Sequence, residues 1–201
     1  MVKTIEGKAA ILVIDVQYDF IKEDGAVPCV GGWDIVPRIN RLTDAGRKVG
    51  IPVIFTQEFH RKEKVDFGRE LDGAEPYHCL EGTEGVEIVK ELNIKGGDYV
   101  IKKPRYNAFL KTDLELLLNG LGILARDTLI IVGVATNVCI HYTSAEAHQR
   151  DYRIRVVEEC CAGTSPDEHE ASLTAIKYLQ AGGRVKLEEM LDAIAKYEKQ
   201  G

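Results

Sequence analysis

The stretch Thr128–Thr143 reads TLIIVGVATNVCIHYT and changes character half-way along. Residues 129–132 form a β-branched and apolar run that is too short for a helix and ends at a glycine, which is typical of a buried parallel strand. The second half places apolar residues at helical spacing after Thr136 and Asn137, two good N-cap residues. The stretch therefore predicts a strand, a turn and a helix whose first turn contains Cys139.

A cysteine at this position has two interpretations. The unpaired N–H groups and the positive end of a helix dipole favour a thiolate over a thiol, which suits a nucleophile. Cysteine is also among the residue types most often buried, so a lone cysteine after a strand can serve packing alone. Partner residues at the same place are needed to choose between the two.

Apolar strands alternate with helical patterns along the rest of the chain. Strands are predicted near residues 9–14, 52–56, 98–102, 129–132, 153–157 and 185–187. Further helices are predicted at residues 33–48 and 83–92, behind capping boxes at residues 112–115 and 165–168, and at residues 188–200. This alternation predicts right-handed βαβ units, and hence an α/β fold with a parallel sheet covered on both faces.

Three chemically useful residues each stand just beyond the end of a predicted strand, namely Asp15, Lys103 and Cys139. Parallel α/β sheets bind ligands beyond the carboxyl ends of their strands, so these side chains are expected to meet. Asp15 would act as the base, and Lys103 would lower the thiol pKa and orient Asp15. Backbone N–H groups of the turn at residues 135–139 would bind an oxyanion. The predicted reaction is attack of sulfur on an amide or ureide carbonyl, followed by hydrolysis of a thioester.

Composition narrows the class of protein. The 201 residues are 45% hydrophobic and 29% charged, which predicts one globular domain over residues 1–201. The formal net charge of −6 disfavours nucleic-acid and anionic-membrane partners, and no apolar run reaches the roughly 18 residues that a membrane span needs. The odd count of five cysteines and the absence of a signal-like start predict reduced thiols and a cytoplasmic location.

Three blocks of sequence carry a family resemblance: VIDVQ at residues 13–17, KKPRYNAF at residues 102–109 and GVATNVC at residues 133–139. In this order they resemble the three signatures of the isochorismatase-like cysteine hydrolases. That family includes nicotinamidases, N-carbamoylsarcosine amidases, and ureidoacrylate and biuret hydrolases. The resemblance spans about residues 9–187.

The resemblance implies both a fold and a site. The implied fold is a three-layer α/β/α sandwich with a six-stranded parallel sheet of order 3-2-1-4-5-6. The implied catalytic triad is Asp15, Lys103 and Cys139. A cis peptide between Val134 and Ala135 would aim the N–H groups of Ala135 and Cys139 at the oxyanion.

Two departures from the family pattern concern the substrate. Asn107 stands where the family commonly has serine. Nicotinamidases carry an Asp-x-His pair and a further histidine that bind a divalent metal, and this chain offers Glu58, His60 and His78 instead. These three residues either hold a metal, since imidazole and carboxylate suit zinc, or face the substrate without one. We expect no cofactor and favour the second interpretation.

The segments around residues 58–61 and 78–83 look more like carbamoylsarcosine-amidase relatives, so a small ureide or carbamoyl substrate is favoured. Further pocket residues are expected to be Phe20, Tyr106, Asn107 and Asn137. The alternatives are a metal-assisted nicotinamidase and a catalytically inert α/β binding protein. An aspartyl phosphatase is disfavoured, because such enzymes need a second Asp where this chain has Gln17.

The last predicted helix has apolar residues along one edge: Met190, Leu191, Ile194 and Tyr197. We expect this edge to be exposed and to form a partner surface. Together with the family resemblance, it predicts a homo-oligomer, either a dimer or a tetramer.

Overall fold

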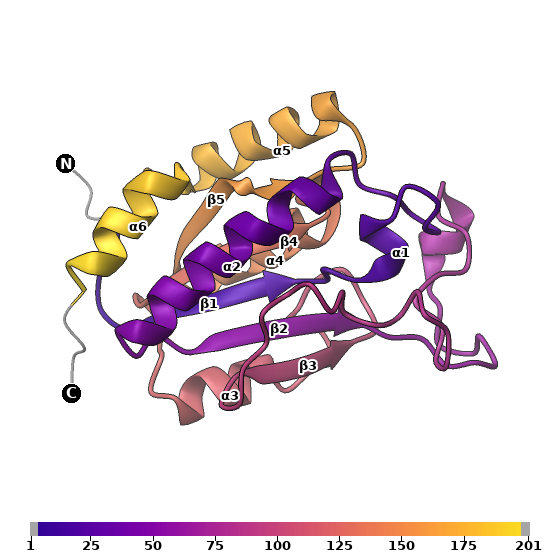
Figure 1. Ribbon diagram of the computed structural model, residues 1–201, viewed down its shortest axis with the longest axis horizontal. Helices are drawn as coiled ribbons and strands as arrows, with labels where there is room; N and C mark the ends of the chain where they lie inside the picture. Colours follow the sequence, from indigo (N-terminus) through magenta and orange to yellow (C-terminus); the bar gives the residue numbers. More distant parts are fainter. Residues whose placement is uncertain (1–3, 198–201) are drawn as a thin grey trace.

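The computed structural model describes residues 4–197 and is built around one parallel sheet (Figure 1). Its six strands lie in the order β3-β2-β1-β4-β5-β6, and all neighbouring pairs are parallel. The strands are β1 (Ala9–Ile14), β2 (Val53–Glu58), β3 (Tyr99–Lys103), β4 (Thr128–Val134), β5 (Arg153–Ala162) and β6 (Arg184–Val185). The predicted strand order is confirmed.

Helices cover both faces of this sheet. The helical segments are α1 (Tyr18–Ile21), α2 (Gly32–Lys48), a 3-10 turn η1 (Arg69–Asp72), α3 (Leu114–Gly120), a π-helical turn η2 (Thr136–Ile140), α4 (His141–Gln149), α5 (Pro166–Leu179) and α6 (Leu187–Ala195). α2 and α6 pack on one face, and α3, α4 and α5 pack on the other (Figure 1). Within residues 4–197, no helix combines the length and the hydropathy that crossing a membrane requires.

The apolar sequences of the two central strands, β1 and β4, follow from burial on both faces of the sheet. Every residue of β1 and β4 is buried, because alternate side chains enter the two cores on opposite faces of the sheet. Ile11 and Val13 pack beneath α2, whereas Leu12 and Ile14 pack on the side of α3 and α4. A continuous apolar run is therefore what a strand covered on both sides needs.

Gly133 controls the approach of β4 to β1. Its φ is +116°, and a Cβ atom added there would lie 2.1 Å from the carbonyl oxygen of Ile14. Only glycine permits both the backbone conformation and this close approach. The close approach brings the turn after β4 beside Asp15, the residue that follows β1.

The helix predicted at residues 83–92 is wrong, since the structure has a series of turns there. Val86, Val89 and Leu92 are buried at three-residue intervals, which imitates the spacing of a helix. The carbonyl groups that a helix would use are bonded elsewhere: Gly85 and Glu87 accept from the N–H groups of residues 19 and 18. Pairing with the segment after β1 has replaced helical bonding.

Two smaller differences concern helix starts. α1 lies in a segment for which the sequence predicts no helix, and α3 begins at Leu114 without the predicted capping box. The hydroxyl of Thr112 donates to the carbonyl of Ala108 (2.5 Å) and accepts from the N–H of Leu114 (3.2 Å). Thr112 therefore ends the preceding turn and does not form the predicted reciprocal cap with Glu115.

The predicted exposed edge of the last helix is also wrong. Met190 and Ile194 are 0% and 1% exposed, and Leu191 and Tyr197 pack partly buried against the same core. An amphipathic helix buries its apolar stripe against the sheet layer, and α6 does so beside α2. This helix therefore lends no support to the predicted homo-oligomer. The part of the predicted helix beyond residue 197 lies outside the described residues.

Ser165 caps α5 as predicted, with Pro166 in the first turn. Its hydroxyl accepts from the N–H of Glu168 at 3.2 Å. We expect Ser165→Ala to lower the free energy of unfolding by about 1 kcal/mol, because one N–H at the helix start loses its partner. Ser165→Gly should cost only a few tenths of that, roughly 0.3 kcal/mol, since glycine is tolerated as an N-cap. Urea unfolding of both variants tests this, and an equal loss in the two would contradict the capping role.

Candidate active site

The structure brings together Asp15, which follows β1, Lys103, the last residue of β3, and Cys139, which lies in the turn after β4. The Nζ atom of Lys103 lies 2.7 Å from Oδ2 of Asp15 and 3.4 Å from Sγ of Cys139. Asp15 and Lys103 are 0% exposed, and Cys139 is 4% exposed. Cys139 belongs to η2, which follows β4 directly through a cis peptide between Val134 and Ala135. The predicted meeting of the three side chains is thus observed.

Thr56 fixes the position of Asp15. Its hydroxyl donates to Oδ1 of Asp15 at 2.7 Å and accepts from the backbone N–H of Asp15 at 3.2 Å. Asp15 has a φ of +50°, a left-handed conformation that aspartate tolerates better than most residues. One carboxylate oxygen therefore faces Thr56 and the other faces Lys103. Sequence reasoning missed Thr56, although its place near the end of β2 puts it beside the end of β1.

A second carboxylate, that of Glu58, enters the same cluster from the end of β2. Its Oε2 lies 3.3 Å from Nζ of Lys103 and accepts a long hydrogen bond from the thiol of Cys139, at 3.8 Å. Its Oε1 lies 3.4 Å from Nε2 of His60 and 3.5 Å from Nε2 of His78. Glu58 therefore connects the histidine pair to the lysine and the thiol.

Burial decides the protonation of the thiol. It raises the pKa of Cys139 well above that of a free cysteine, and the opposing effect of Lys103 is smaller. The pKa of Lys103 is itself well above its usual value, because Asp15, Cys139 and Glu58 outweigh the effect of burial. The prediction that this position gives a ready thiolate is therefore wrong for the closed site. A neutral thiol beside a cation needs a base before it can attack.

The two carboxyl groups differ in their affinity for a proton. Burial raises the pKa of Asp15, although Lys103 opposes it. The pKa of Glu58 is well below its usual value: burial would raise it, but Lys103 and the nearby imidazoles of His60 and His78 outweigh that effect. Asp15 is thus the carboxyl group better able to accept a proton, while Glu58 stays charged. Such a division of two nearby carboxyl groups is typical of acid–base sites.

A small cavity lies against the thiol. It encloses about 10 Å³, which is room for about one water molecule. The residues that line it come from six separate segments: Phe20, Val27, Glu58, Glu75, Tyr106, Ala135, Val138, Cys139 and Thr164. Phe20, Glu58 and Tyr106 were predicted to be pocket residues. Glu75, Val27 and Thr164 were missed, because they lie in segments without a motif or a periodic pattern.

Four predicted pocket residues do not line this cavity: His60 and His78, which contact Glu58, and Asn107 and Asn137. Oδ1 of Asn107 accepts from the N–H of Phe109 at 2.9 Å, which holds the turn after β3. Nδ2 of Asn137 donates to the hydroxyl of Thr164 at 2.8 Å, which ties η2 to the segment after β5. Both side chains therefore support the walls of the cavity from behind.

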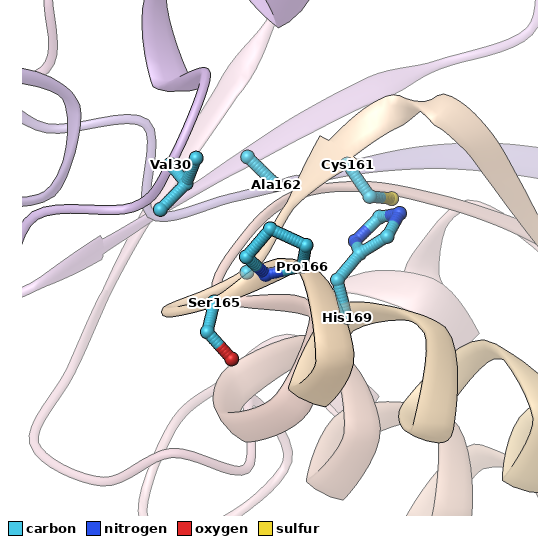
Figure 2. A pocket seen from close by; sticks show the side chains of 7 residues that line it. Val30, Cys161, Ala162, Ser165, Pro166 and His169 are labelled. Atoms are coloured by element: carbon cyan, nitrogen blue, oxygen red, sulfur yellow. The ribbon is translucent and has the colours of Figure 1, made fainter.

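A second cavity, of about 190 Å³, lies between the end of β5 and the start of α5 (Figure 2). Cys161 and His169 both line it, but neither is set up as a nucleophile or base. Burial raises the pKa of Cys161 well above its usual value, and Nδ1 of His169 is hydrogen-bonded to the hydroxyl of Thr136 at 2.8 Å. The hydrogen bond of His169 to Thr136 instead ties α5 to η2, the turn that contains Cys139, which is a structural role.

Glu58, His60 and His78 form a buried group of possible metal ligands. One ligand atom from each lies within 4.8 Å of the other two. His60 and His78 are 0% and 2% exposed, and Nε2 of His78 is buried without a hydrogen-bond partner among the described residues. Two imidazoles and a carboxylate suit zinc, so the residues fit a divalent ion.

Comparison with known proteins places the chain in a family. Residues 9–187 match the isochorismatase domain. The chain belongs to the isochorismatase family. Over 174 residues it is 35% identical to a probable inactive nicotinamidase of Arabidopsis thaliana, which covers 84% of this chain and 87% of that protein. Over 183 residues it is 31% identical to a ureidoacrylate amidohydrolase of Yersinia enterocolitica, with coverage of 79% and 77%.

A solved structure of this family includes a metal. It is a pyrazinamidase of Pyrococcus horikoshii in complex with zinc, 27% identical, with a TM-score of 0.78 over 90% of this chain and 99% of that one. The isochorismatase-family chain is therefore a hydrolase whose relatives include amidohydrolases.

Proposed function

We propose that this isochorismatase-family hydrolase cleaves the C–N bond of a small amide, carbamoyl compound or ureide, with Cys139 as the nucleophile. The observation that carries the proposal is the contact of Lys103 with both Asp15 and the sulfur of Cys139 at the edge of a small cavity. A thiol, a carboxylate base and a fixed cation are what acyl transfer to water requires.

The first half of the reaction forms a thioester. Asp15 takes the proton of the Cys139 thiol as sulfur attacks the carbonyl carbon and a C–S bond forms. The N–H groups of Ala135 and Cys139 receive the resulting oxyanion. The proton on Asp15 then passes to the leaving nitrogen, the C–N bond breaks, and ammonia or an amine departs.

The second half restores the enzyme. Asp15 takes a proton from water, the hydroxide attacks the thioester carbonyl, and the C–S bond breaks. The proton returns to sulfur, and the acid product leaves. Lys103 stabilises the negative charge on Asp15 and on sulfur as the proton moves between them, because its Nζ contacts both.

No cofactor is needed in this scheme. A divalent ion held by Glu58, His60 and His78 would supply Lewis-acid binding of a substrate nitrogen or oxygen. The unpartnered Nε2 of His78 favours this metal-assisted nicotinamidase as the second candidate. The narrower assignment to N-carbamoylsarcosine hydrolysis, which rests on sequence resemblance, stays a prediction.

Ammonia release tests the proposal directly. We expect turnover of at least one of nicotinamide, biuret, ureidoacrylate and N-carbamoyl amino acids, and time-dependent inactivation by iodoacetamide. An inert binding protein would show neither turnover nor loss of activity, and the probable inactive relative makes this rival concrete. Unchanged turnover after complete alkylation of Cys139 would exclude the cysteine mechanism.

The proposed base sets the pH dependence. Because burial raises the pKa of Asp15, we expect kcat/KM to fall with decreasing pH through a pKa above 3.8, the ordinary value of aspartate. The sign follows from the need for an unprotonated Asp15 in attack. On the alkaline side Lys103 stays charged beyond its ordinary 10.5, since its pKa is raised. The measurement is kcat/KM for an uncharged substrate across pH, with circular dichroism as the check on folding. An acid limb at or below 3.8 would argue against Asp15.

A further inference from the structure

The cavity beside Cys139 has an acidic lining. Glu58 and Glu75 are among its nine lining residues, and none of these nine is a lysine or an arginine. A carboxylate-bearing substrate needs a cationic or N–H partner, whereas a neutral ureide needs acceptors for its own N–H groups. The lining therefore favours a neutral ureide over a carboxylate-bearing substrate.

Lys103 is too fully engaged to bind a substrate carboxylate. Its ammonium group has three protons, and Nζ contacts Asp15 Oδ2 at 2.7 Å, the carbonyl of Arg105 at 2.9 Å and Glu58 Oε2 at 3.3 Å. It is 0% exposed and lies behind the cavity lining. A substrate anion would have to displace one of these partners.

Glu75 lines the cavity and has fewer contacts than Lys103. Its Oε2 accepts from the hydroxyl of Tyr106 at 3.0 Å, and its side chain is 17% exposed. Among residues 4–197, Oε1 of Glu75 has no hydrogen-bond partner. Nε2 of His78 lies 3.9 Å from Glu75 and 3.5 Å from Glu58, so one imidazole faces two carboxylates. Burial lowers the pKa of His78, but Glu58 and Glu75 outweigh that effect and raise it to about 9, so this imidazole is one cation shared by two carboxylates. It is not among the lining residues, so Glu75 has no cation of its own beside the thiol.

Because the cavity is so small, substrate entry involves the contact between Glu75 and Tyr106. A cavity of about 10 Å³ cannot admit an amide until its lining parts. Glu75 comes from the long segment between β2 and β3, while Tyr106 follows β3, so their hydrogen bond joins two walls. A substrate N–H can replace the tyrosine hydroxyl as the donor to Glu75.

We propose that Glu75 is a specificity residue that binds an N–H group of the substrate, so that the site selects small uncharged ureides and amides over carboxylate-bearing ones. This rests on the proposed function, and it narrows the substrate class to compounds of the biuret kind rather than N-carbamoyl amino acids or ureidoacrylate. A substrate carboxylate in this position would meet Glu75 as a like charge, with no free cation in the lining.

The test compares two substrates that differ in charge alone at one end, N-carbamoylglycine and N-carbamoylglycinamide, with biuret as a third. Ammonia release is measured with a chelator present, because a divalent ion on the histidine pair would change the charge of the cavity. We expect kcat/KM to be about tenfold or more higher for the uncharged compounds. Glu75→Gln should reduce that ratio by about tenfold, mainly through KM. Wild-type preference for N-carbamoylglycine, or an unchanged ratio in Glu75→Gln, would overturn the proposal.

Two variants act as controls. Glu63→Gln makes the same chemical change on an exposed side chain of the same segment and should leave the ratio unaltered. Tyr106→Phe removes the hydroxyl donor but keeps the charge of Glu75, so it should keep the preference for uncharged compounds. A loss of preference in Tyr106→Phe equal to that in Glu75→Gln would assign selectivity to the shape of the wall and would contradict the role of Glu75.

A binding measurement separates this proposal from the proposed function. Substrates that enter the cavity should protect Cys139 from iodoacetamide, whether or not they are hydrolysed. We expect biuret and N-carbamoylglycinamide to protect at lower concentrations than N-carbamoylglycine, and Glu75→Gln to narrow the difference. If this pattern of protection is found without any turnover, the hydrolytic function is rejected and the specificity is kept. If turnover is found but N-carbamoylglycine protects at the lowest concentration, the hydrolytic function is kept and the specificity is rejected.

Discussion

Cys139→Ala is expected to lower kcat by about 10⁴-fold to 10⁶-fold, because it removes the atom that forms the covalent bond to the substrate. The neighbouring groups cannot replace it. Asp15 is held by Thr56 and Lys103, and Glu58 is held by Lys103 and faces the histidine pair. Any remaining turnover would come from binding and the oxyanion contacts alone. Steady-state ammonia release, with the protein at high concentration, measures a loss of this size.

A matched thiol serves as the control for this prediction. Cys160 is 0% exposed and Cys139 is 4% exposed, but Cys160 lies in the core on the side of α2 and α6. Cys160→Ala should cost some stability and leave kcat within about twofold. Thermal unfolding of Cys139→Ala should show a folded protein, since only one sulfur atom is lost. Activity that survives in Cys139→Ala but falls in Cys160→Ala would contradict the assignment of the nucleophile.

Much of the fold could be predicted because its signals are local. A strand buried on both faces needs a continuous apolar run, and residues 9–14 and 129–132 supply such runs. Asp15, Lys103 and Cys139 were predicted to meet because each lies just beyond a predicted strand, and parallel strands end at one edge of the sheet. Position along the chain was therefore enough to find the cluster.

Other features depend on contacts between distant segments, which no local pattern encodes. The turns at residues 83–92 bury apolar side chains at helical spacing, but their carbonyl groups bond to the segment after β1. The pKa of the Cys139 thiol is raised by burial, and the cavity beside this thiol is lined by residues as far apart as Phe20 and Thr164. Glu75 lies in an irregular segment, where neither periodicity nor spacing marks a residue as part of a wall.

The sequence identified Glu58 as a site residue but did not predict all of its contacts. Its spacing to His60 suggested a metal ligand or a substrate contact. The structure adds a contact with Lys103 that spacing could not predict, because Glu58 and Lys103 pair across β2 and β3. Their register places the two strand ends side by side. The result is one ammonium group shared by two carboxylates.

Lys103→Met follows from that sharing and is expected to damage both stability and turnover. Removing one member of a buried ion pair leaves uncompensated charge, which costs about 3–5 kcal/mol of unfolding free energy. Here two buried carboxylates, Asp15 and Glu58, lose the same partner. Turnover should fall by about 10³-fold or more, because neither the carboxylate nor the developing thiolate retains a cation. Lys102→Met is the matched control: its side chain is exposed on the same strand, and its replacement should cost less than about 1 kcal/mol.

The pH dependence of this loss shows whether charge is its cause. In the wild type, the raised pKa of Lys103 stabilises the fold below 10.5, and the lowered pKa of Glu58 stabilises it above 4.5. Both contributions are present at neutral pH. In Lys103→Met the two carboxyl groups bind protons more readily, so the deficit relative to wild type should shrink as the pH falls. Urea unfolding at several pH values measures the deficit, and Asp15→Asn in the same background should recover part of it. A deficit that is independent of pH would mean that lost packing around the lysine stem, rather than unpaired charge, destabilises the variant.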